Sequence, residues 1–99
     1  MIFNISGKNL TTLKGIDFPD GITELDCSEN SLTSLEYCPN SLEYLHCSNN
    51  LLTSLQYSPN TVIWLNRYGN PLSLEYLNKP IEDIHKINTL KSYKLVNEL

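Results

Sequence analysis

The chain repeats one short pattern at a fixed interval of 20 residues. The pattern reads LDCSENSLTSL over residues 25–35 and LHCSNNLLTSL over residues 45–55, and a weaker copy, LNRYGNPL, follows over residues 65–72. A fixed period in this range is typical of solenoids, in which each repeat buries its apolar face against its neighbours. The period therefore constrains the fold more strongly than any single motif.

Four repeats and a helical tail account for the sequence, and we predict one domain over residues 1–99. The repeats cover about residues 2–21, 22–41, 42–61 and 62–78. The opening repeat has Lys8 where the next three have asparagine, which fits a terminal repeat with a single neighbour. From Pro80 onward, isoleucine recurs at helical spacing, with acidic residues early and lysines late. We therefore expect a helical cap over about residues 80–98 that covers the last strand.

Each repeat should supply one short strand, at roughly residues 2–5, 24–27, 44–47 and 64–67. Side chains alternate along a strand, so leucine and cysteine should point inward and their neighbours outward. The proline segments that follow favour short 3₁₀ or polyproline-like turns on the convex side. The predicted fold class is an α/β repeat solenoid with a short parallel sheet on its concave face. Inside it, a column of asparagines should bind the backbone of adjacent turns: Asn30, Asn50 and Asn70.

Charge and composition argue against several functional classes. A net charge of −4 and a pI near 4.9 argue against nucleic acid as the partner. No apolar run approaches the roughly 20 residues of a membrane-spanning helix, so we expect no membrane partner. The first residues lack the basic flank and apolar core of a signal peptide, which favours a cytoplasmic location. Cys27 and Cys47 share one inward repeat position and are expected to be reduced core thiols.

The pattern L-x-x-L-x-C-x-x-N-x-L, at residues 42–52 and with isoleucine first at residues 22–32, resembles the leucine-rich repeat. The 20-residue unit with a late Pro-Asn-Ser-Leu resembles the short class found in bacterial effectors and in repeat proteins of giant DNA viruses. The resemblance covers about residues 2–77. It implies an arc-shaped scaffold whose concave face binds another protein, which is a host protein in the host cytoplasm if the chain is viral. Bacterial effectors of this type often carry a ubiquitin-ligase domain, but the tail is short and lacks a cysteine, so that activity is not expected here.

The outward strand positions form the predicted binding surface. Exposed aromatic side chains of the kind found there often dominate protein interfaces. For Trp64, packing under the helical cap is a nearly balanced alternative. The predicted protein-binding residues are Glu24, Asp26, Tyr44, His46, Trp64, Asn66 and Tyr68.

A hydrolase-like set is the strongest argument for an enzyme. Neighbouring strands should place Asp26 about 5 Å from His46, with Ser28 or Ser48 nearby. A shallow face without an oxyanion hole argues against catalysis. A metal site is also disfavoured, because His46 and Cys47 should point to opposite faces of the sheet. We therefore predict a non-enzymatic interaction module with no catalytic, metal or cofactor-binding residues.

Self-association is the alternative function. Residues 1–21 contain no recognisable cap, so the strand at residues 2–5 is expected to leave an open sheet edge. Two copies that pair through this edge would form a homodimer.

Overall fold

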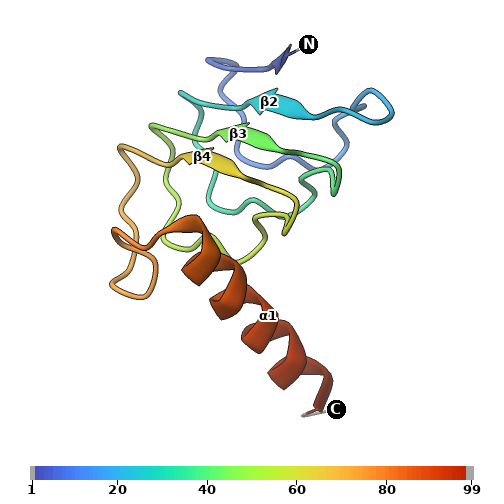
Figure 1. The fold of residues 1–99 in the computed structure, drawn as a ribbon. Coiled ribbons are helices and arrows are strands. Elements are labelled where there is room, and N and C mark those ends of the chain that lie inside the picture. Colours follow the sequence, from blue (N-terminus) through green and yellow to red (C-terminus); the bar gives the residue numbers. More distant parts are fainter. Residues whose placement is uncertain (1, 98–99) are drawn as a thin grey trace.

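The computed structural model describes residues 2–97 and contains four short strands followed by one helix (Figure 1). The strands are β1 (Ile2–Asn4), β2 (Glu24–Asp26), β3 (Tyr44–His46) and β4 (Trp64–Asn66), and the helix is α1 (Ile81–Asn97). Each strand ends one residue before its predicted boundary. The helix predicted over about residues 80–98 runs from Ile81 to Asn97; Pro80 precedes it, and residue 98 lies outside the described residues.

All four strands form one parallel sheet in the order β1-β2-β3-β4, so neighbours in sequence are also neighbours in space. Equivalent repeat positions lie beside one another without any shift: Leu25 pairs with Leu45, and Leu45 pairs with Leu65. A constant repeat length makes this register possible, because each turn of chain returns to the same point one strand further along. The parallel sheet predicted from the 20-residue period is thereby confirmed.

The core lies behind the sheet and consists mainly of equivalent leucines from successive repeats. The central leucines of β2 and β3 are fully buried, as are the leucines that follow these two strands. The prolines begin single hydrogen-bonded turns rather than 3₁₀ helices; for example, Val62 N donates to Pro59 O at 3.1 Å. The fully buried leucines are Leu13, Leu25, Leu32, Leu35, Leu42, Leu45, Leu52 and Leu55.

The asparagine column lies within this core and makes the predicted backbone contacts. Asn50 Oδ1 accepts a hydrogen bond from Leu32 N at 3.0 Å, and its Nδ2 donates to Cys27 O and Cys47 O, each at 3.1 Å. Asn30 and Asn70 bind the neighbouring turns in the same way. One side chain per repeat thus satisfies backbone groups on two adjacent turns.

The residue just before each of these asparagines adopts a left-handed backbone conformation. The φ angles are 58° at Glu29, 54° at Asn49 and 79° at Gly69, and Gly7 at the same position of the first repeat has a φ of 62°. Asparagine and glycine tolerate this conformation, whereas a glutamate side chain adopts it at a cost. Glu29 is therefore the least favourable residue in this column.

Replacing Glu29 by asparagine is expected to stabilise the fold by about 0.5–1 kcal/mol, because asparagine relieves part of this strain. Thermal unfolding followed by circular dichroism would show a melting temperature higher by a few degrees. The control is Glu36→Asn, at an exposed position with ordinary φ. An equal gain in both variants would attribute the effect to the lost charge instead.

Helix α1 contacts the repeats through buried polar side chains in its first half. His85 Nε2 lies 2.8 Å from Val62 O, and Asn88 Nδ2 donates to Leu55 O at 2.9 Å. Tyr76 OH donates to Asn88 Oδ1 at 2.8 Å. The helix expected to cover the last strand thus binds backbone carbonyl groups of the loops, those of Val62 and Leu55. Further along the helix, Leu90 is 61% exposed. Within the described part of the chain, no helix is both long enough and apolar enough to cross a bilayer.

Candidate protein-binding surface

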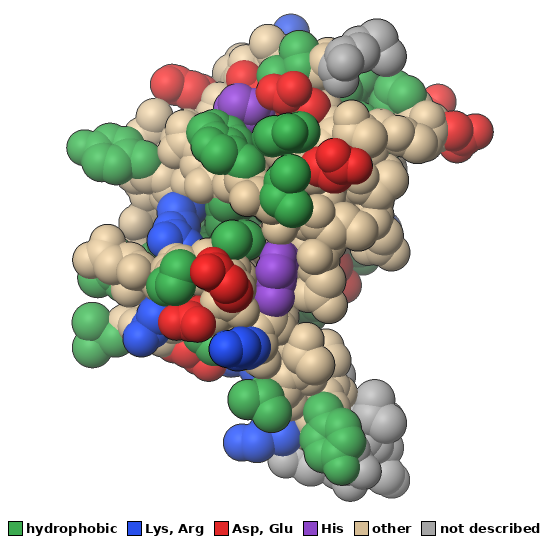
Figure 2. All heavy atoms as spheres, viewed as in Figure 1, with side chains coloured by type: hydrophobic (Ala, Val, Ile, Leu, Met, Phe, Trp, Pro, Cys, Tyr) green, Lys and Arg blue, Asp and Glu red, His purple; other side chains and the backbone are tan. Residues whose placement is uncertain are grey.

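The outward side chains of β2, β3 and β4 form a continuous surface, which we call the outer sheet face. In Figure 2, hydrophobic, acidic and histidine side chains gather over these strands, and most lysine and arginine side chains in that view lie lower on the molecule. Tyr44 and Trp64 are 40% and 45% exposed. The face comprises Glu24, Asp26, Tyr44, His46, Trp64 and Asn66.

Four of these side chains surround a hollow of about 330 Å³: Glu24, Tyr44, His46 and Trp64. His46 Nε2 donates to Glu24 Oε2 at 2.8 Å, and the His46 ring lies 4.7 Å from the Trp64 ring between centroids. Packing of Trp64 under the helical cap, the nearly balanced alternative, is not observed, because the indole lies half-exposed beside His46. The hollow thus combines two half-exposed aromatic rings with a carboxylate held in place by a histidine.

His46 is free to reach Glu24 because it breaks a local pattern. At the same position in the other repeats, Asn4, Asp26 and Asn66 each accept a hydrogen bond from the backbone N–H two residues later. The imidazole of His46 is directed instead across the sheet, diagonally to the preceding strand. The Glu24–His46 pair therefore depends on a single departure from the repeat.

The hydrolase-like arrangement does not form. Asp26 and His46 are register partners, as predicted, but Asp26 Oδ1 accepts hydrogen bonds from Ser28 N at 3.0 Å and Ser28 Oγ at 2.5 Å. His46 is engaged by Glu24, so no histidine activates Ser28. Ser28 is thus hydrogen-bonded to a carboxylate and not to a histidine, so the Asp-His-Ser order of a hydrolase triad is not assembled.

Tyr68 and Asn66 lie beyond the hollow. Asn66 Oδ1 accepts from Tyr68 N at 3.2 Å, and the Tyr68 side chain is 81% exposed. Tyr68 therefore does not line the hollow that Tyr44 and Trp64 share. Arg67 takes the inward repeat position and its guanidinium donates to Lys79 O, directing its charge away from the outer sheet face.

The three cysteines are free thiols. Burial raises the pKa of Cys27 to about 12, with a smaller contribution from the Asp26 charge. Burial likewise raises the pKa of Cys47 well above its ordinary value. Thiolate is the nucleophilic form of cysteine, so these two side chains act at neutral pH as core apolar groups.

Among residues 2–97, no group of three or more histidine, cysteine, aspartate and glutamate side chains is arranged to hold a metal ion. Comparison with protein-family models, curated proteins and solved structures found no match to the chain. The geometry of the outer sheet face therefore carries the functional argument.

Sequence reasoning missed the Glu24–His46 pair and the tilted ring contact between His46 and Trp64. Both contacts connect neighbouring strands, and the hydrogen bond between Glu24 and His46 runs diagonally between positions offset by two residues. Diagonal neighbours on a sheet lie within reach of long side chains. The available signal was the replacement of an asparagine or aspartate by histidine at residue 46.

Proposed function

We propose that this chain is a non-enzymatic protein-interaction module, built as a short leucine-rich-repeat solenoid, that binds a basic segment of a partner through the outer sheet face. The hollow lined by Tyr44, Trp64, His46 and Glu24 is the observation that carries the proposal. Aromatic side chains with a polar edge are enriched among the residues that dominate protein interfaces. The solenoid assignment rests on the in-phase repeats and the asparagine column.

The partner group best suited to the hollow is the side chain of a lysine or arginine. Glu24 and Asp26 bring negative charge to the face, and the two aromatic rings offer faces to a cation. No lysine or arginine lines the hollow among the described residues, so a basic ligand meets no like charge there. Charge complementarity of this kind favours specificity and faster association.

Replacing Tyr44 and Trp64 by alanine is expected to weaken binding of a basic peptide by about tenfold or more, because both aromatic contacts are lost. Peptides would first be selected from a displayed random library on the immobilised wild-type chain. Those selected should be enriched in lysine and arginine, and their affinity should fall as salt rises. Fluorescence anisotropy would then compare the variants.

The control variant is Leu74→Ala, because Leu74 is 84% exposed and lies outside the outer sheet face. It should bind the selected peptides as wild type does. Selection of peptides without basic residues, or equal binding by the double variant, would contradict the proposal.

Self-association remains a second candidate, because β1 pairs with β2 alone among the described strands. A second copy that extends the sheet at β1 would bury Ile2, which is 44% exposed. Sedimentation at increasing protein concentration would then report a dimer, whereas a constant monomer mass would eliminate this candidate.

A further inference from the structure

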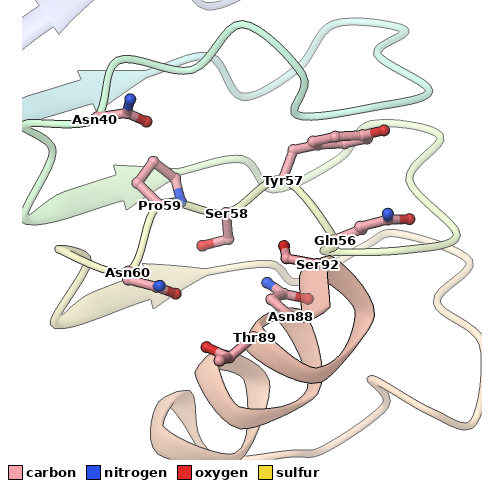
Figure 3. Close-up of a pocket in the computed structure, with 9 residues that line it drawn as sticks. All are labelled: Asn40, Gln56, Tyr57, Ser58, Pro59, Asn60, Asn88, Thr89 and Ser92. Atoms are coloured by element: carbon pink, nitrogen blue, oxygen red, sulfur yellow. The ribbon is translucent and has the colours of Figure 1, made fainter. Parts of the chain in front are cut away.

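A second hollow, of about 290 Å³, lies between helix α1 and the turn formed by residues 56–60 (Figure 3). Its lining is polar but uncharged, and consists of amide and hydroxyl side chains together with Tyr57 and Pro59. It shares no lining residue with the hollow on the outer sheet face. Residues from the turn form one wall, and Asn88, Thr89 and Ser92 of α1 form the other.

Ser58 provides a buried hydroxyl with an unused hydrogen-bonding capacity at this hollow. The residue is only 4% exposed, and its Oγ has no hydrogen-bond partner among the described residues. Figure 3 shows Ser58 on the turn and Asn88 on the facing side of α1. A buried hydroxyl without a partner is costly, so its presence indicates a group that satisfies it.

The internal repeat shows that a hydroxyl is not required at this position for folding. The segment EYCPN at residues 36–40 corresponds to QYSPN at residues 56–60, so Cys38 is the counterpart of Ser58. Only the later copy faces α1 across the hollow. The third repeat therefore has the Ser58 hydroxyl at a position where the second repeat forms the same turn with the Cys38 thiol.

Asn88 adds directed donors and acceptors to the same wall. One N–H of its amide binds Leu55 O, and its Oδ1 accepts from Tyr76 OH, which fixes the orientation of the amide. Its second N–H is then available at a defined angle. Amides held in this way recognise hydroxyl groups that both donate and accept.

We propose that this hollow binds a small uncharged polyhydroxyl ligand, specifically a hexose unit. The volume is at the lower end for ligand pockets, which suits one sugar ring. The amides and hydroxyls match the alternating donors and acceptors of adjacent sugar hydroxyls, and the half-exposed Tyr57 ring offers an apolar face to the C–H side of the ring. Because no charged side chain lines the hollow, a charged sugar finds no counter-ion.

The test is a titration of the isotopically labelled full chain with methyl glucoside, methyl galactoside and methyl mannoside, followed by amide chemical shifts. At least one sugar should shift the amides of residues 56–60 and 88–92, and glucuronate should bind more weakly. A second experiment tests binding to an immobilised glycan array. Binding to the array without binding to the free glycosides would show that the hexose is recognised as the terminal unit of a glycan.

Ser58→Ala should reduce sugar affinity by about tenfold or more without lowering the melting temperature, because the removed hydroxyl has no protein partner. Thr89→Val, at the rim on α1, should also weaken binding, whereas Ser31→Ala, at an exposed position outside the hollow, should not. The proposal is overturned if no hexose binds in either experiment, if the shifts lie elsewhere, or if Ser58→Ala binds as wild type. Destabilisation by Ser58→Ala without sugar binding would identify a trapped water as the partner of the hydroxyl.

Discussion

Replacing Leu45 by alanine is expected to destabilise the fold by about 3 kcal/mol. Leu45 is fully buried at the centre of β3, between Leu25 and Leu65 of the neighbouring strands. The truncation removes apolar contacts and leaves a cavity that the rigid stacking of the repeats cannot close. Urea denaturation followed by circular dichroism would measure the loss as a lower midpoint with a similar slope.

The matched control is Tyr44→Ala, one residue earlier on the same strand. Its side chain points outward and is 40% exposed, so we expect a loss below about 1 kcal/mol. The comparison tests the register directly, because a shift of one residue would exchange the two effects. Equal destabilisation by both variants would contradict the observed alternation.

Replacing Asn50 by alanine is expected to cost about 2–3 kcal/mol, although the residue contributes little apolar area. Asn50 is 4% exposed, and its removal leaves Leu32 N without an acceptor and Cys27 O without this donor. Buried backbone groups that lose their partners carry most of the cost. Asn50→Asp should be at least as damaging at neutral pH, because it places a carboxylate against backbone carbonyls.

Asn40→Ala is the control for this series, since Asn40 is exposed and lies outside the asparagine column. Its effect on the urea midpoint should be within about 0.5 kcal/mol. If Asn50→Ala were equally mild, the hydrogen bonds of the column would be too weak to explain the in-phase asparagines.

The fold was predictable in its main features because repetition multiplies a weak signal. A single leucine or asparagine is weak evidence for a structural position, but asparagine at residues 30, 50 and 70 indicates the same position in three successive repeats. The sequence reasoning therefore located the strands, the register and the inward asparagines. It also predicted the helix at the end of the chain, where the 20-residue period gives way to helical spacing.

The candidate surface was predictable only as a set of outward positions. Alternation along a strand identified Tyr44, Trp64 and Glu24 as outward, and the register followed from the period. Whether these side chains meet depends on rotamers and on competing local hydrogen bonds. Asp26 is held by its own turn, so His46 pairs with Glu24 instead.

Local periodicity thus determines which residues of this chain face the core, because burial of the apolar side chains must repeat whenever the pattern repeats. The tertiary structure alone decides the contacts that cross between repeats or between the repeats and α1. The contact of the Trp64 indole with His46 and the placement of Ser58 and Asn88 on opposite walls of the second hollow are two examples. Both involve side chains at positions where one repeat differs from the others. The sequence shows that such a residue differs, but only the folded chain shows which residue it contacts.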